Sequence, residues 1–330
     1  MDFSVYPKLE LHLHLDCSLS YNVVHRINSS ITEEAYQHDF IAPAKCTNLA
    51  DFLTRAPRSI ALMQTEEQLR LVVFDLFEQF QRDHLLYAEI RFAPLLHIDR
   101  GLSPEQVVEV VEGATSQACA SSGIEARLIL CTLRHFSTEQ SLQTAKLVER
   151  FRGTRVAALD LAGDEAGFPI APHIPAYQYA ADQNLPRTAH AGEASGPQSI
   201  WETLRSLHPS RIGHGVRSIE DPTLIEHLRK ERIHLEVCPT SNLQTNIYDT
   251  FTDHPINTLY ELGISLSVNT DARTITDITL TREYAKLRQV FAWDKQHFLR
   301  CNLEAIRASF LPETTRQQLA AQLQEGYRTL

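Results

Sequence analysis

Short apolar runs alternate with longer amphipathic stretches along most of the chain. Continuous apolar runs separated by helical segments are typical of parallel strands that are buried on both faces. Eight runs have the length of such strands: Leu9–Leu13, Leu85–Phe92, Arg127–Cys131, Val156–Leu161, Arg187–Ala191, Ser210–His214, Ile233–Cys238 and Ile264–Asn269. The segments with helical spacing between them include Glu66–Arg82, Pro104–Ser121, Glu139–Arg150, Ala176–Asp182 and Pro222–Glu231.

Three of the helical segments begin directly after a residue that caps helices, namely Thr65, Ser103 or Asp221. A side-chain oxygen at this position accepts a hydrogen bond from a backbone N–H of the first turn. Proline follows Ser103 and Asp221, and it fits the first turn because its missing N–H would have been unpaired there. These residues therefore predict where three helices begin.

Strand–helix alternation repeated eight times predicts an α/β fold in which a parallel sheet closes into a (β/α)8 TIM barrel. An open, doubly wound sheet is the rival fold. Neither G-x-G-x-x-G nor G-x-x-x-x-G-K-[ST] follows any of the runs, so its phosphate-binding signatures are missing. Barrels of 330 residues commonly form one domain, and we expect a single domain over residues 1–330.

The segment between the first two strands is unusually long, from about Asp16 to Thr65. It contains an apolar stretch with helical spacing, NLADFLTRAPRSIALM. Long connections usually have a function, and covering the barrel mouth is a common one. We therefore expect a helical lid between the first strand and the first barrel helix, with a stabilising side layer as the alternative.

Composition and charge limit the partners. The formal net charge of −10 and the lack of a basic run argue against nucleic acid, which requires a basic face. No apolar run approaches the roughly 20 residues that span a bilayer, and the N-terminus lacks a signal-peptide pattern. The six cysteines are scattered without a C-x-x-C pair, so neither a disulfide framework nor a cysteine zinc site is expected. We expect a cytoplasmic protein with a small-molecule partner, and the oligomeric state stays open.

Polar residues recur where four of the predicted strands end: LHLHLD, TAHAGE, IGHGV and SVNTD. The carboxyl ends of barrel strands hold the active site in this fold. His12 and His14 are two residues apart, so their side chains point to the same face. The eighth strand closes beside the first, which places Asp271 next to this pair, and His190 comes from the fifth strand. Three imidazoles and one carboxylate suit Zn²⁺ and leave a coordination position for water.

Two further polar residues follow at the same rim. Glu193 lies three residues after His190, on a loop from which it could reach a bound ring, with a solvated loop glutamate as the alternative. His214 stands between two glycines, which let backbone and ligand approach closely. A histidine that only orients other groups is its alternative. The histidines outside the rim that we expect only to pack or to lie at the surface are His84, His135 and His234.

Six motifs resemble the adenosine deaminase family, in this order and over nearly the whole chain: PKLELHLHLD, DLAGDE, HAGE, RIGHGV, EVCPTSN and SVNTD. The resemblance implies a barrel with one zinc ion per chain that hydrolyses the amino group at C6 of adenosine or a related aminopurine. It implies His12, His14, His190 and Asp271 as the zinc ligands, with His14 also facing the substrate. The other zinc deaminase pattern, H-x-E with P-C-x-x-C, is absent from the sequence.

The resemblance also implies the remaining roles. Glu193 is similar to the residue that protonates the ring nitrogen beside the reacting carbon. His214 is similar to the residue that orients the hydroxide on zinc, with Asp271 on its other side. Gly163 resembles the glycine whose N–H contacts the purine. Asp16 resembles the contact to a ribose hydroxyl in nucleoside-specific members.

The sequence departs from the family pattern at two positions. Ala272 stands where the family has a second aspartate, which contacts the imidazole nitrogen of the purine, and Cys17 stands where the family has glycine. A lost partner for a buried polar group costs about 1–3 kcal/mol, which Arg273 would have to compensate. Adenosine remains the first choice because Asp16 is kept. The alternative substrates are adenine and a modified or different aminopurine, such as an N6-substituted adenine nucleoside or nucleotide.

Two other functions are weighed against a purine deaminase. The first is a hydrolase on the same metal barrel that cleaves an amide or another C–N bond outside a purine ring. The second is a catalytically inactive nucleoside-binding protein, for which Ala272 is the best support. The expected ligands and the expected proton donor are all present, which disfavours lost activity.

Overall fold

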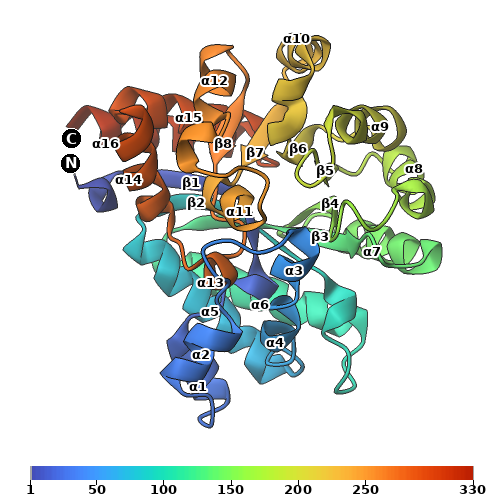
Figure 1. Ribbon diagram of the computed structural model, residues 1–330. Coiled ribbons are helices and arrows are strands. Elements are labelled where there is room, and N and C mark those ends of the chain that lie inside the picture. The colour runs from blue at the N-terminus through green and yellow to red at the C-terminus, as the bar shows by residue number, and fades with distance from the viewer. Residues whose placement is uncertain (1, 330) are drawn as a thin grey trace.

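Within residues 2–329, which the computed structural model describes, eight strands form the centre of the molecule and helices surround them (Figure 1). Neighbouring strands pair in parallel, in the orders β1-β2-β3-β4 and β5-β6-β7-β8. Each predicted run coincides with one strand, and the ends differ by at most two residues. The strands are β1 (Lys8–His14), β2 (Leu85–Phe92), β3 (Glu125–Leu133), β4 (Val156–Ala162), β5 (Thr188–Ala191), β6 (Arg211–His214), β7 (His234–Val237) and β8 (Leu266–Val268).

Two single bridges join the four-stranded halves. At one seam, Leu159 of β4 forms a parallel bridge with Arg187, directly before β5. At the other seam, Asp271, just after β8, forms a parallel bridge with Leu13 of β1. The N–H of His14 donates to the Asp271 carbonyl there, at 2.7 Å. The predicted (β/α)8 barrel is therefore confirmed.

The predicted barrel helices are all present, and the three predicted caps are confirmed. Thr65, Ser103 and Asp221 each accept a hydrogen bond from a backbone N–H in the first turn of the helix that follows. The helices around the barrel are α5 (Glu66–Arg82), α6 (Pro104–Ser122), α7 (Thr138–Arg150), α8 (Ile174–Asp182), α9 (Pro197–Leu207), α10 (Pro222–Glu231), α12 (Ile256–Glu261), α14 (Leu280–Phe291), α15 (Lys295–Ala308) and α16 (Glu313–Thr329). Two shorter helices lie at the strand ends, α11 (Pro239–Gln244) and α13 (Arg273–Thr276).

The long connection after β1 folds into α1 (Tyr21–Ile27), α2 (Glu33–Asp39), α3 (Leu49–Leu53) and α4 (Ala56–Ile60). The apolar stretch NLADFLTRAPRSIALM forms two short helices instead of one. Pro57 has no N–H to donate to the carbonyl four residues earlier, so a continuous helix is interrupted between α3 and α4. In Figure 1, α1 and α2 lie at the side of the barrel near α5, and α3 lies over the strand ends. The connection is thus a side layer in its first half and a lid in its second.

Two backbone hydrogen bonds fasten the lid to the barrel. The N–H of Ala42 donates to the carbonyl of Ile275, and the N–H of Cys46 donates to the carbonyl of Gln244, both at 2.8 Å. The two carbonyls belong to α13 and α11, which follow β8 and β7, so the segment before α3 is bound at the ends of these two strands. The lid is therefore held from the side of the barrel that carries Asp271.

Two sequence expectations concern the molecule as a whole. Within residues 2–329, all six cysteines are buried free thiols, in agreement with the expected lack of a disulfide framework. Among the helices of the same residues, none combines the length and the apolar character that crossing a membrane would need.

Candidate active site

Side chains from several strand ends meet in one cavity beneath α3. Its volume is about 50 Å³. Its polar side is made by predicted site residues, and its other side is apolar. The lining residues are His14, Cys17, Leu49, Phe52, Leu53, Gly163, His190, Glu193, His214, Asp271, Ala272 and Ile275.

The four predicted metal ligands lie within a few ångströms of one another. Nε2 of His14 is 3.2 Å from Nε2 of His190. Oδ1 of Asp271 is 3.5 Å from Nε2 of His12 and 3.4 Å from Nε2 of His14. One donor atom from each of His12, His190, His214 and Asp271 also lies within 4.8 Å of the others. The structure therefore brings together the residue types that bind a transition-metal ion.

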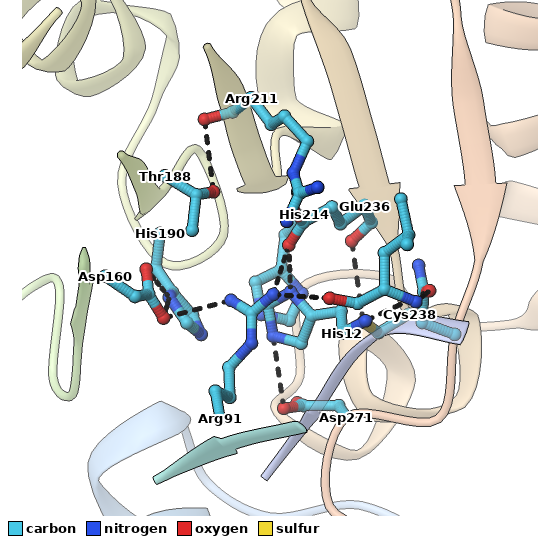
Figure 2. A network of polar contacts seen from close by, with 12 residues as sticks. His12, Arg91, Asp160, Thr188, His190, Arg211, His214, Glu236, Cys238 and Asp271 are labelled. Atoms are coloured by element: carbon cyan, nitrogen blue, oxygen red, sulfur yellow. Dashed lines mark hydrogen bonds and ion pairs between the residues drawn. The ribbon is translucent and has the colours of Figure 1, made fainter. Parts of the chain in front are cut away.

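Carboxylates behind two of the imidazoles fix their orientation, as Figure 2 shows. Nδ1 of His12 is 2.9 Å from Glu236 Oε2, and Nδ1 of His190 is 3.2 Å from Asp160 Oδ1. Because a carboxylate only accepts, Nδ1 carries the proton in both rings and Nε2 presents a lone pair to the cluster. Nε2 of His12 is buried and has no hydrogen-bond partner among residues 2–329. This orphaned acceptor fits a bound cation.

Burial favours the neutral form of three imidazoles in the cluster, those of His14, His190 and His214. Burial lowers the pKa of His14 to about 3, and burial also lowers the pKa of His190. Burial, reinforced by the neighbouring His12, holds the pKa of His214 well below its ordinary value. Metal ligation requires unprotonated imidazole nitrogens, so these rings suit a metal ion without prior loss of a proton.

His214 and Asp271 have left-handed backbone conformations, with φ of 59° and 64°. Such residues carry a strain of about 1–3 kcal/mol and persist where surrounding contacts determine them. Glu10 supplies such contacts: Oε1 accepts from the N–H of Thr270 at 2.7 Å, and Oε2 binds Nη2 of Arg273 at 2.6 Å. Glu10 thus binds the turn on both sides of Asp271.

Arg273 does not fill the place of the missing aspartate. Its guanidinium binds Glu10 and, at 2.9 Å, Asp83, which lies at the end of α5. Arg273 is not among the residues that line the cavity. The suggestion that it compensates for Ala272 is therefore wrong, because two buried carboxylates already hold it.

Glu193 faces His214 across the cavity, with its Oε2 3.6 Å from Nε2 of that ring. The side chain is buried, and its Oε1 has no hydrogen-bond partner within residues 2–329. Burial raises the pKa of Glu193 well above its ordinary value, and the negative charges of Asp271 and Glu165 act in the same direction. The raised pKa favours the protonated carboxyl group, which is the form that a proton donor needs.

A second glutamate holds the loop that carries Glu193. The buried carboxylate of Glu165 accepts from the N–H groups of Gly192 at 2.7 Å, Glu193 at 2.9 Å and Ser195 at 2.9 Å, and from the hydroxyl of Ser199. Glu165 belongs to the DLAGDE motif, but no local pattern indicates these contacts, because they depend on the approach of two loops that are distant in the sequence.

The two predicted substrate contacts differ in position. Gly163 lines the cavity with a left-handed φ of 98°, as glycine readily allows. Asp16 lies outside the lining and is buried; its Oδ2 accepts from the N–H of Ala93 at 3.2 Å and is 3.8 Å from Nε2 of His97. The ribose contact of Asp16 thus stays a prediction.

The wall beside Asp271 is apolar. Ala272 belongs to a buried cluster with Cys17, Leu49, Phe52 and Ile275, all of which line the cavity. The two departures from the family pattern, Ala272 and Cys17, therefore occur together on one wall. Ala272 lacks the carboxylate of the family pattern, and Cys17 adds a buried side chain to the same wall.

A network of buried charged side chains surrounds the imidazoles inside the barrel (Figure 2). Arg91 binds Asp160 at 3.0 Å and Glu236 at 2.6 Å, so one guanidinium holds the carboxylates behind both His190 and His12. Sequence reasoning missed this network. Its only signal was the presence of charged residues inside apolar runs, as in YAEIRF.

The comparisons with known proteins decide the family. The family model described as "Adenosine deaminase" matches residues 7–326. The chain belongs to the adenosine deaminase family. A relative named adenosine deaminase in Lacticaseibacillus paracasei is 35% identical over 338 residues, which cover 100% of this chain and 99% of that protein. This member of the adenosine deaminase family is therefore a hydrolase that acts on C–N bonds.

Solved structures give the same family with different substrates in their names. An adenine deaminase from Arthrobacter aurescens superposes with a TM-score of 0.89 at 27% identity, covering 97% of this chain and 98% of that one. An N6-methyl-AMP deaminase from Arabidopsis thaliana has a TM-score of 0.85 at 25% identity, covering 98% and 97%. The likeness supports an aminopurine deaminase and leaves the choice of purine to the site itself.

Proposed function

We propose that this protein is a zinc-dependent adenosine deaminase that converts adenosine and water to inosine and ammonia. The observation that carries the proposal is the position of the buried Glu193, whose raised pKa favours its protonated form, beside the cluster of imidazoles and Asp271. Deamination of a purine needs both a proton for the ring and a nucleophile for the carbon that bears the amino group. The cavity offers groups for both tasks on adjacent walls.

His12, His14, His190 and Asp271 would hold the zinc ion, whose contribution is to acidify a water molecule so that it reacts at neutral pH. Glu193 gives its proton to the ring nitrogen beside the attacked carbon, which gains electron density as water adds. Asp271 and His214 flank the attacking oxygen. The ring keeps the oxygen of water, and the two protons of water complete the balance: one leaves with the amino group as ammonia, and the other restores the proton that Glu193 gave to the ring.

The cavity walls favour a nucleoside over a nucleotide. Leu49, Phe52 and Leu53 of α3 close the cavity, and Cys17 lies beside them. Burial of a phosphate dianion against such side chains, without a cation to pair with it, is strongly unfavourable. The relative from Lacticaseibacillus paracasei bears the name adenosine deaminase, which supports the same choice.

A second candidate is an adenine nucleoside with an apolar substituent on N6. The apolar wall that includes Ala272 and Ile275 favours it, because a carboxylate at position 272 would be the natural partner of an unsubstituted purine edge. Such a substrate would keep the reaction and release an amine instead of ammonia.

Product release from the zinc-loaded protein tests the proposal. The panel contains adenosine, deoxyadenosine, adenine, AMP and N6-methyladenosine, and Glu193→Gln is the control for a lost proton donor. We expect turnover of adenosine above that of AMP, and loss of turnover in the control. Preference for the N6-substituted nucleoside would favour the second candidate. Inactivity on the whole panel, with zinc bound, would contradict a purine deaminase.

A further inference from the structure

A buried chain of hydrogen bonds leads from the backbone of α12 to His214. The N–H of Ile256 lies 3.2 Å from Nδ1 of His254, and Nε2 of His254 lies 3.2 Å from Oδ1 of Asn242. The amide nitrogen of Asn242 lies 3.2 Å from Nδ1 of His214. All three side chains are almost completely buried. None of the sequence motifs assigned a function to His254 or Asn242.

The direction of this chain is fixed at its remote end. A backbone N–H can only donate, so Nδ1 of His254 must accept. Burial lowers the pKa of His254 to about 3, so the ring is neutral and its one proton resides on Nε2. This N–H donates to the carbonyl oxygen of Asn242, which turns the amide NH₂ toward His214.

The amide in turn fixes the proton of His214. Because the NH₂ of Asn242 donates, Nδ1 of His214 must accept and has no proton, so the proton of the ring lies on Nε2. Nε2 points into the site, 3.6 Å from Oε2 of Glu193. An N–H group, and not a lone pair, therefore faces the cavity from β6.

The partners behind the imidazoles separate them into two kinds. His12 and His190 have carboxylates behind Nδ1 and present lone pairs, as metal ligands must. His214 has an amide behind Nδ1 and presents a proton, although its ring lies only 4.8 Å from that of His12. Proximity alone would place His214 in the ligand set, and the direction of its hydrogen bonds excludes it.

We propose that His254 and Asn242 are positioning residues that hold His214 as a hydrogen-bond donor and keep it out of the metal-binding set. Only the catalytic consequence of this proposal, the effect on kcat, rests on the proposed deaminase function. In that reaction the Nε2–H of His214 stabilises the oxygen that attacks the purine. Loss of one such preorganised donor typically lowers kcat by about 100- to 1,000-fold.

Nitrogen-15 NMR of the zinc-loaded wild-type protein tests the proton position directly. The two nitrogens of a neutral imidazole differ strongly in chemical shift according to which bears the proton, and a His214→Ala spectrum assigns the signals. We expect a protonated Nε2 and an unprotonated Nδ1 in His214. A protonated Nδ1 with an unprotonated Nε2 would overturn the proposal.

Asn242→Asp reverses the polarity of one contact and preserves the other. Aspartate has the same shape and still accepts from Nε2 of His254, but it can only accept from His214. We expect the proton of His214 to appear on Nδ1, and kcat to fall about 100-fold or more with a small change in KM. An unchanged proton position, or a kcat within about threefold of wild type at full zinc occupancy, would contradict the proposal.

His254→Phe tests the remote end, with His234→Phe as the matched control. His234 is equally buried, but it lies at the start of β7 between the hydroxyls of Ser265 and Ser267, which are 2.9 Å away. We expect both variants to lose stability and only His254→Phe to alter the nitrogen signals of His214. Equal signals of His214 in the two variants would argue against the relay. The NMR measurement needs no substrate. It therefore tests the position of the His214 proton even if the protein turns over none of the purines in the panel.

Discussion

Glu193 is the residue whose single proton the proposed chemistry requires. In Glu193→Gln the side chain keeps its size but has no proton to transfer. We expect kcat for adenosine to fall by about 100- to 10,000-fold, the usual contribution of general acid catalysis. KM and zinc content should stay close to wild type, since the glutamate is not an expected ligand. Steady-state ammonia release and metal analysis check this, and a kcat within about tenfold of wild type would refute the assigned role.

The same carboxyl group makes stability depend on pH. Burial raises the pKa of Glu193 above its ordinary value of 4.5, so above pH 4.5 the folded chain retains a proton that the unfolded chain has released. The free energy of unfolding therefore falls as pH rises through this window, until the folded carboxyl group ionises.

Urea unfolding of the metal-free protein at pH 5 and pH 8 measures this effect. We expect the wild type to lose more stability over the interval than Glu193→Gln, which has no ionisable group there. Glu226→Gln, an exposed position on α10, is the control and should behave as the wild type. Parallel stability curves for the wild type and Glu193→Gln would contradict the buried, protonated state.

At the scale of elements, the loop after β5 depends on one carboxylate from the loop after β4. Glu165→Gln replaces one acceptor by a donor that faces backbone N–H groups. We expect faster amide hydrogen exchange at Gly192 and Glu193, and a kcat lowered by about 10- to 100-fold through misplacement of Glu193. Zinc content should not change. Glu202→Gln, exposed on α9, is the control, and unaltered exchange in Glu165→Gln would refute the anchoring role.

The lid helix α3 offers a test of its own with two phenylalanines of the same insertion. Phe52 lines the cavity, whereas Phe40 is similarly buried but lies away from it. Alanine at either position should cost about 3–5 kcal/mol of stability. Only Phe52→Ala should raise KM for adenosine, by about tenfold or more, because only this ring would pack on the substrate. Equal KM values in the two variants would contradict the role of α3 as a lid.

The sequence predicted the elements better than the contacts between them. Apolar runs located every strand, and capping residues located three helix starts, because these signals are local. The signal for the break between α3 and α4 was also local, namely Pro57. The helical spacing of the apolar residues on both sides of it nevertheless predicted one continuous stretch. The hydrogen bonds of Glu165, and those that run through Asn242 to His214, join segments that only the closed barrel brings together. No pattern within one segment encodes such distances.

At the scale of the whole molecule, the expected metal ligands come from both halves of the barrel. His12 and His14 belong to β1, in the first sheet, whereas His190 belongs to β5 of the second sheet and Asp271 follows β8, the last strand of that sheet. Among residues 2–329, a single bridge joins the halves at each seam, so an ion held by all four residues would connect the two sheets.

Zinc removal should therefore lower the thermal stability of the entire barrel. A ligand at 1,000 times its Kd stabilises the folded state by about 4 kcal/mol, which calorimetry with and without a chelator would detect as a drop in Tm. His14→Ala should abolish most of the difference between the two scans. Superimposable scans of the zinc-loaded and chelated wild type would contradict a structural link through the ion.

The cavity beneath α3 also has a consequence for the time course of binding. Pockets for drug-sized ligands enclose about 300–1,000 Å³, so a chamber of about 50 Å³ does not admit a nucleoside while α3 is closed. Encounters are then productive only during the fraction of time that α3 is displaced, and the apparent affinity is reduced by that fraction. The observed association rate should rise with substrate concentration and then level off at the unimolecular opening rate.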